Sequence, residues 1–226
     1  MSGLLLLVLF FNGIAAPPEL ERARDAQDRA TLDRLVNQYA TAAQAKANDA
    51  AAQYRYALAE SYAAEVAIEF RDRGAAHNAA EAGIHAAEKA VALKAGSSDY
   101  HRLLGTLCGQ AISANVLQGM KYGRCAQDEV NKALQLDPKS ADNYLARGVG
   151  NYYLPQGLGG GVDLAIKDFQ KAAELDPRSA EAQLWLGLAL RKQNRNAEAR
   201  RAFQKAVDLN PARLWAKQQL EKTPPQ

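Results

Sequence analysis

The chain has 226 residues, of which 48% are hydrophobic and 7% aromatic, and its net charge is +3. Alanine, the best helix former, supplies much of the apolar content, whereas the long alternating runs of Val, Ile and Thr that form sheets are missing. The composition therefore excludes a sheet protein and predicts an all-α protein, and the small net charge by itself indicates no partner.

The chain begins with an unbroken apolar run, residues 4–11, followed by a polar residue and several small ones. This run is shorter than the roughly 20 residues that a transmembrane helix needs, and it is typical of a secretory signal peptide. We therefore assign residues 1–16 to a signal peptide and expect an exported protein, periplasmic or secreted, without a membrane span after cleavage. Because no Lys or Arg precedes Leu4, the alternatives are a true start upstream of this sequence and an uncleaved N-terminal anchor.

Residues 17–96 form a predicted N-terminal helical region with weak internal repetition. Its clearest repeated segment, residues 89–95, reads KAVALKA. The region contains His77 and His85, and His101 follows shortly after it. None of these histidines is spaced from another ligand type as in a metal site. We interpret them as ordinary surface or inter-helix residues and predict no metal and no cofactor.

Cys108 and Cys125 flank a predicted turn at residues 114–118. Because the midpoint between them falls in this turn, the two side chains would lie side by side in an antiparallel helical hairpin. Four glycines would let the two backbones approach closely: Gly105, Gly109, Gly119 and Gly123. The pair therefore forms either a disulfide, which export would permit, or two buried free thiols.

Three heptapeptides of the second half repeat one pattern. Residues 132–138 read KALQLDP, residues 171–177 read KAAELDP, and residues 205–211 read KAVDLNP. The alanine lets a neighbouring helix approach, and the leucine three positions later lies on the same helical face. Since a residue before proline avoids the helical conformation, Asp137, Asp176 and Asn210 are each expected to end a helix. Ser140 and Ser179 are then placed to cap the helices that follow.

The last unit, residues 180–211, shows the pattern most clearly. It predicts two helices with a turn at residues 194–196, and each helix carries small and large residues on one face. These residues are Leu186, Gly187 and Leu190 in the first helix and Ala199, Phe203 and Ala206 in the second. In this fixed order over about 34 positions the unit resembles the tetratricopeptide repeat. The resemblance extends to residues 141–177 and 98–138, and in a more degenerate form to residues 52–96 and 17–48.

The resemblance implies a right-handed α-solenoid of stacked antiparallel helix hairpins. We expect degenerate units in residues 17–96, and three repeats with a capping helix at 212–220 in residues 97–222. Residues 223–226 are a polar tail. Repeat arrays need such a terminal cap for solubility.

Two features invite other chemistry, and neither supports it. The loop at residues 155–161 reads PQGLGGG, but a phosphate loop requires a preceding strand and a following Lys-Ser or Lys-Thr pair, which are absent from the sequence. We interpret it as a long hairpin turn. No nucleophile and base motif and no recognisable carboxylate pair is visible, so we predict a non-catalytic protein.

By resemblance to the family, residues of each first helix line a concave groove that binds a partner protein or peptide. The groove residues are predicted to be Asp142, Leu145, Val149, Tyr152, Tyr153, Glu181, Leu184, Leu188, Arg191 and Lys192. Tyrosine and arginine are favoured anchors in interfaces. An extended peptide, or a helix with an acidic end, would suit this surface. The alternative is that these residues pack against the N-terminal helices instead.

Two further functions are considered. Residues 152–172 look like a segment of the tetratricopeptide-type T-components of TRAP transporters, which implies an accessory subunit of a solute transport system. A strongly hydrophobic pocket beside Tyr152 would favour that function. Residues 178–226 carry 10 basic and 4 acidic side chains, including Arg195, Arg200 and Arg201. We interpret this basic patch as a solvated helix surface and predict no nucleic-acid partner, because base-stacking aromatics are not interleaved with the charges.

Overall fold

The computed structural model describes residues 16–224, so the predicted signal peptide lies almost entirely outside the described residues. The described part is built from α-helices and two short 3-10 turns, and it contains no strand. The fold is therefore the predicted all-α array of helical hairpins. The helices of the first half are α1 (Pro18–Asp25), α2 (Arg29–Ala45), α3 (Ala50–Glu69), α4 (Arg73–Leu93), α5 (Ser98–Ala114) and α6 (Gly119–Leu136). Those of the second half are α7 (Ala141–Tyr153), α8 (Val162–Leu175), α9 (Ala180–Lys192), α10 (Asn196–Leu209) and α11 (Leu214–Glu221).

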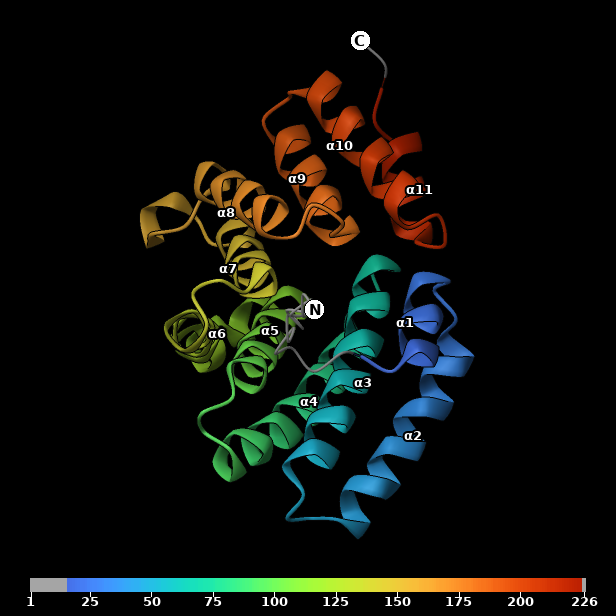
Figure 1. Cartoon of the computed structure of the whole chain (residues 1–226), viewed down its shortest axis with the longest axis vertical. Coiled ribbons are helices and arrows are strands. Elements are labelled where there is room, and N and C mark those ends of the chain that lie inside the picture. Colours follow the sequence, from blue (N-terminus) through green and yellow to red (C-terminus); the bar gives the residue numbers. More distant parts are fainter. Residues whose placement is uncertain (1–15, 225–226) are drawn as a thin grey trace, which may run out of the picture.

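The hairpins stack in chain order and the array bends back on itself. Figure 1 shows the chain passing from α1 and α2 through α5 and α6 to α9 and α10, with α11 finally lying beside the N-terminal helices. The two 3-10 turns, η1 (Val116–Gln118) and η2 (Gln156–Leu158), occupy the predicted turn and the predicted glycine loop. The array is thus curved so strongly that its first and last helices meet.

Helix ends follow the punctuation that the repeats predict. Asp137, Asp176 and Asn210 each occupy the position directly after a helix, which confirms the three predicted stops. The hydroxyl groups of Ser140 and Ser179 accept hydrogen bonds from the backbone N–H groups three residues later, and both are confirmed as N-caps. The N-terminal half uses aspartate instead, with Asp28, Asp49 and Asp72 as side-chain caps.

A glycine facing a phenylalanine joins the two helices of each C-terminal hairpin. A Cβ atom on Gly148 would lie 2.5 Å from Cε1 of Phe169, and one on Gly187 would lie 2.5 Å from Cε1 of Phe203. Both rings are fully buried. Only a residue without a side chain leaves room for the ring, so this contact fixes how closely the two helices pack.

The buried apolar residues of the array form two principal clusters. One runs through α1 to α6 and includes Leu35, Tyr54 and Leu107. The other runs through α7 to α11 and includes Phe169 and Phe203. No buried apolar cluster of the described residues crosses from one half to the other. The array is therefore two cores joined at the seam between α6 and α7.

Cys108 and Cys125 are joined by a disulfide that links α5 to α6, with their Cα atoms 6.0 Å apart. The proposed role of the glycines is only partly right. Gly105 packs against Val130, where a Cβ atom would meet the valine side chain at 2.7 Å. The other three, Gly109, Gly119 and Gly123, face open space, because helical rotation turns them away from the partner helix.

Within residues 16–224, no helix combines the length and the apolar character needed to cross a bilayer.

Candidate interaction surface

Four aromatic side chains of α7, α9 and the capping helix α11 form a continuous cluster, here called the aromatic patch: Tyr152, Tyr153, Trp185 and Trp215. The ring of Trp185 lies 5.7 Å from that of Tyr152, 6.1 Å from that of Tyr153 and 5.6 Å from that of Trp215. All three contacts are edge-on, a geometry that aromatic pairs prefer. Side chains from three helices thus meet around one tryptophan.

The aromatic patch is open to solvent along part of its surface. Tyr153 is 49% exposed, and Tyr152, Trp185 and Trp215 are half-buried. Burial raises the pKa of the Tyr153 hydroxyl to about 12, with the neighbouring Tyr152 adding to the effect, and burial also raises the pKa of Tyr152. Both phenols are therefore neutral near pH 7 and remain available as hydrogen-bond donors.

Lys192 extends the aromatic patch with a positive charge. Its Nζ atom donates a hydrogen bond to the backbone oxygen of Tyr152 at 2.8 Å and lies 4.2 Å from the centre of the Tyr152 ring. The lysine is exposed. An ammonium group donates up to three hydrogen bonds, so this one keeps donor capacity for an acidic group on a partner.

Two leucines of the predicted groove are buried, which corrects their expected role. Leu184 has no exposed surface and Leu188 is 6% exposed, and both belong to the C-terminal core. The sequence pattern missed this because residues of α8, α10 and the capping helix α11 all join the core to which these two leucines belong. Leu145 and Val149 are partly buried against that core and keep some exposed surface.

Arg191 also faces the end of the array and not an open groove. Its guanidinium donates to the Gln219 side chain at 2.6 Å and to the Thr223 hydroxyl at 3.1 Å. It also lies 5.4 Å from the centre of the Phe203 ring. Arg191 therefore attaches the capping helix to α9. Arg200 attaches the same helix to α10 by donating a hydrogen bond to the backbone oxygen of Leu220, so part of the predicted basic patch holds the C-terminal segment in place.

The acidic members of the predicted groove face other helices of the array. Asp142 is exposed and lies 3.9 Å from Arg102 of α5. Burial raises the pKa of Glu21 in α1, and the charges of Asp25 and Asp142 raise it further while Arg24 lowers it. The carboxylates of Glu21 in α1 and Asp142 in α7 therefore interact electrostatically, although the two helices belong to different halves of the array.

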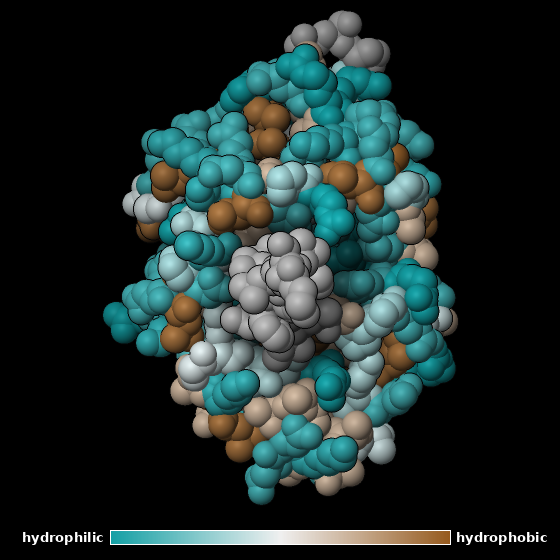
Figure 2. Space-filling model, in the orientation of Figure 1, coloured by the Kyte–Doolittle hydropathy of each residue, from teal (hydrophilic) through white to brown (hydrophobic). Residues whose placement is uncertain are grey.

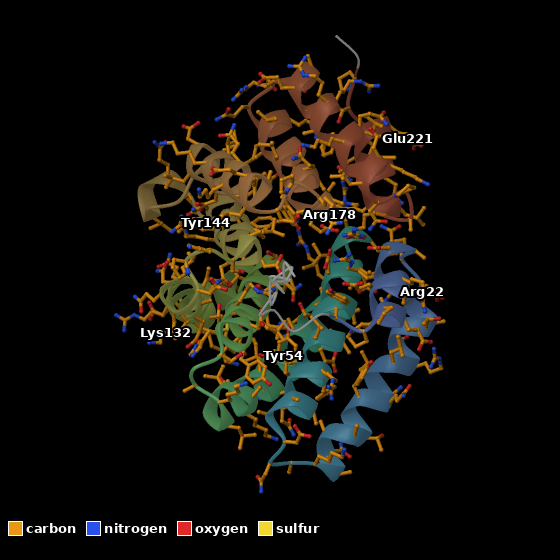
Figure 3. The ribbon with its side chains drawn as sticks, viewed as in Figure 1. Arg22, Tyr54, Lys132, Tyr144, Arg178 and Glu221 are labelled. Carbon is orange, nitrogen blue, oxygen red and sulfur yellow. A yellow bond between two sulfur atoms is a disulfide. The ribbon has the colours of Figure 1, made fainter. Side chains whose placement is uncertain are left out.

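Glu181 belongs to a cluster that joins the two ends of the array, here called the charged junction: Arg24, Asp25, Glu65, Glu69, Glu181 and Arg213. Arg213 directly precedes α11 and is completely buried. Figure 3 shows side chains of both halves meeting where one end of α3 lies beside α11, near the labelled Arg178. The predicted alternative, that groove residues pack against N-terminal helices, therefore holds for Glu181.

Two hollows in the surface lie away from the aromatic patch. One, about 430 Å³ in volume, is lined by His77 and other residues at the start of α4, by the end of α5 and by Asn115 directly after it. The other, about 340 Å³, is lined by the glycine loop and the start of α8. Tyr152 lines neither. Within residues 16–224 no group of three or more His, Cys, Asp or Glu side chains is arranged to hold a metal.

The face seen in Figure 2 is mostly hydrophilic, with small separated apolar spots. Leu117 and Met120 are also exposed apolar residues, and they lie at the tip of the hairpin of α5 and α6. They lie on a different hairpin from the aromatic patch, which remains the place where several aromatic side chains from different helices gather.

Sequence reasoning missed Trp185 and Trp215. Trp185 lies next to a predicted groove position but on the neighbouring flank of α9, and Trp215 lies in a helix interpreted only as a cap. The signal that could have found them is composition, since the chain has only two tryptophans and both lie in its last fifth.

Comparisons with known proteins agree on the architecture. A family model described as tetratricopeptide repeat matches residues 159–213. A thermophilic TPR protein of Thermus thermophilus is 18% identical over 91% of this chain and 98% of its own, with a TM-score of 0.63. The HusA haemophore of Porphyromonas gingivalis is 18% identical over 77% of this chain and 92% of its own, with a TM-score of 0.58. Identity at this level shows a shared fold alone. No curated protein matches the sequence.

Proposed function

Because the chain is a tetratricopeptide repeat protein, we propose that it is an exported, non-catalytic scaffold that binds a protein or peptide through the aromatic patch. The observation that carries this proposal is the contact of Trp185 with aromatic side chains of α7 and α11, with Lys192 beside them. Tyrosine and tryptophan in a cluster with one open side are the residues that most often dominate binding energy at protein interfaces.

The chemistry of the surface defines the partner. Half-buried rings offer apolar contact area, and neutral phenols offer hydrogen bonds without charge. Lys192 attracts a carboxylate at one edge of the patch. The partner is therefore a segment that places an apolar or aromatic side chain on Trp185 and an acidic group near Lys192.

Export is supported by the predicted signal peptide and by the disulfide between Cys108 and Cys125. Disulfides persist in oxidising compartments and are rare in the cytosol. A thiol count on the protein, isolated from the exported fraction and denatured without reductant, tests this. No free thiol is expected. Two free thiols, or recovery of the protein only from the cytosol, would contradict export.

The binding proposal is tested by capturing partners from the exported fraction with the mature chain and with a Tyr153→Ala, Lys192→Glu variant. The matched control is Leu164→Ala, Lys167→Glu, which changes an exposed leucine and an exposed lysine on the outer helix α8 of the same repeat. For a captured partner, the first variant is expected to bind at least about tenfold more weakly, as loss of an interface anchor does.

The control variant is expected to bind as the unchanged protein does. If both variants retain the partner equally, the aromatic patch is not the binding surface. If both lose it equally, the partner covers the outer helices as well.

A further inference from the structure

The two ends of the array meet through polar groups and not through a shared core. The buried apolar clusters stay within α1 to α6 or within α7 to α11. What crosses between the ends is the charged junction, together with a hydrogen bond from Asn210 to Asp25 at 2.7 Å and one from Gln218 to Gln27 at 2.9 Å. Closing the array therefore buries charge and not apolar surface.

Arg213 holds the junction from its centre. Its Nη2 atom lies 2.6 Å from a carboxylate oxygen of Glu65 and 2.6 Å from one of Glu69, both on α3. Its Nε atom lies 2.8 Å from Glu181 on α9. One side chain before α11 thus ties the first half to the last repeat.

The closed junction is incompletely satisfied. Nη1 of Arg213 is buried and has no hydrogen-bond acceptor among the described residues. Within residues 16–224, four carboxylates, including Asp25 at 3.8 Å from Arg213, pair with two guanidinium groups, those of Arg24 and Arg213. Buried charges repay their desolvation only when they are well paired, so the junction contributes little net stability and can separate at small cost.

We propose that the charged junction is a latch: the array opens there, with α1 and α3 separating from α9 and α11, while both cores stay folded. The hinge is the seam at residues 137–140 between α6 and α7. There Asn143 donates hydrogen bonds to the backbone oxygens of Ala133 and Asp137, both at 3.0 Å, and holds the two halves together as they move.

The surplus of carboxylates makes the latch sensitive to pH. Burial raises the pKa of Glu65 to about 7, although Arg213 and Arg24 lower it, while the charges of Glu181 and Glu69 raise it. Burial also raises the pKa of Glu69, whereas the guanidinium groups of Arg213 and Arg24 lower that of Glu181 against the effect of burial. Tyr62, which lies under Arg24, has a pKa raised by burial and stays neutral.

The direction of the pH effect follows from proton uptake. A carboxyl group with a raised pKa binds its proton more tightly in the closed form than when it is exposed. Its contribution to closure is fully present below its ordinary pKa of 4.5 and is lost as the pH rises through about 7. The latch is therefore expected to be closed at pH 6 and to loosen at pH 8.5.

Small-angle X-ray scattering on the full chain tests the latch, with far-UV circular dichroism to check that the helices remain. The unchanged protein is expected to show a larger radius of gyration and maximum dimension at pH 8.5 than at pH 6. Glu65→Gln, which imitates the protonated side chain, is expected to stay compact at both pH values. Arg213→Met is expected to be extended at both.

The matched controls are Glu174→Gln and Arg201→Met, which change exposed charges on α8 and α10 and should behave as the unchanged protein does. Equal dimensions of the unchanged protein at the two pH values would overturn the latch. So would a Glu65→Gln variant that expands like the unchanged protein. These two measurements decide the matter even if Arg213→Met fails to fold.

Discussion

The two halves of the molecule build the same helical hairpins with different contacts. In α7 to α10 one contact recurs, a glycine against a buried phenylalanine ring, at Gly148 with Phe169 and at Gly187 with Phe203. In the first half the two glycines packed between helices meet aliphatic side chains instead, Gly83 that of Leu107 and Gly105 that of Val130. Alanine fills much of the remaining core there, and a disulfide joins α5 to α6.

This difference explains why the repeat units can be recognised from the sequence in the second half and not in the first. A repeated contact between a glycine and a phenylalanine ring requires small and large residues in the same order in each repeat. A search for sequence repeats detects that order. Alanine packing tolerates many sequences and longer helices, such as the 20 residues of α3 and the 21 of α4. The hairpins of the first half therefore stack in the same way although its sequence shows no regular repeat.

The strongest test of two separate cores is Phe203→Ala. Removing this fully buried ring leaves a cavity and is expected to lower the free energy of unfolding by about 3–5 kcal/mol. In hydrogen exchange, amides of α9 to α11 should lose protection while those of α3 to α5 keep theirs. Phe70→Ala, at a site that is 52% exposed, is the control and should change stability by less than about 0.5 kcal/mol. Equal loss of protection in both halves would show one cooperative unit.

The disulfide gives the reciprocal test, in the first half. Replacing Cys108 and Cys125 with alanine opens a loop of 17 residues, and a constraint of that size is worth about 3 kcal/mol. Urea denaturation should show the loss, and hydrogen exchange should place it in α5 and α6. If the double variant and the parent protein unfold at the same urea concentration, the bond adds nothing to the stability of this half.

The smallest effect compares two serine caps. Ser179 accepts a hydrogen bond from the backbone N–H of Ala182 at the start of α9, whereas Ser97 precedes α5 without a side-chain cap bond. Ser179→Ala is expected to cost about 1 kcal/mol in thermal or urea unfolding, and Ser97→Ala close to nothing. If the two variants lose the same stability, the hydrogen bond of the Ser179 side chain contributes nothing beyond what Ser97 contributes without one.

The sequence predicted the parts of the fold that local chemistry determines. Residues before proline ended helices, serines capped the next ones, and the family order of residues gave the stacking. Leu184 and Leu188 were placed in a groove because family positions describe an interior repeat, whereas α9 belongs to the last repeat and packs under its cap. Arg213 and Glu65 are 148 residues apart, so no local pattern could pair them.

The closure of the array also bears on how the chain folds during biosynthesis. Helical hairpins form from neighbouring residues and fold fast, whereas contacts between distant residues cost loop entropy and come later. The bond between Gln27 and Gln218 spans 191 residues, and Arg213 is synthesised 148 residues after Glu65. The nascent protein must therefore carry Glu65 and Glu69 without their arginine until residue 213 has been synthesised, so the array closes only after the hairpins between these residues can form.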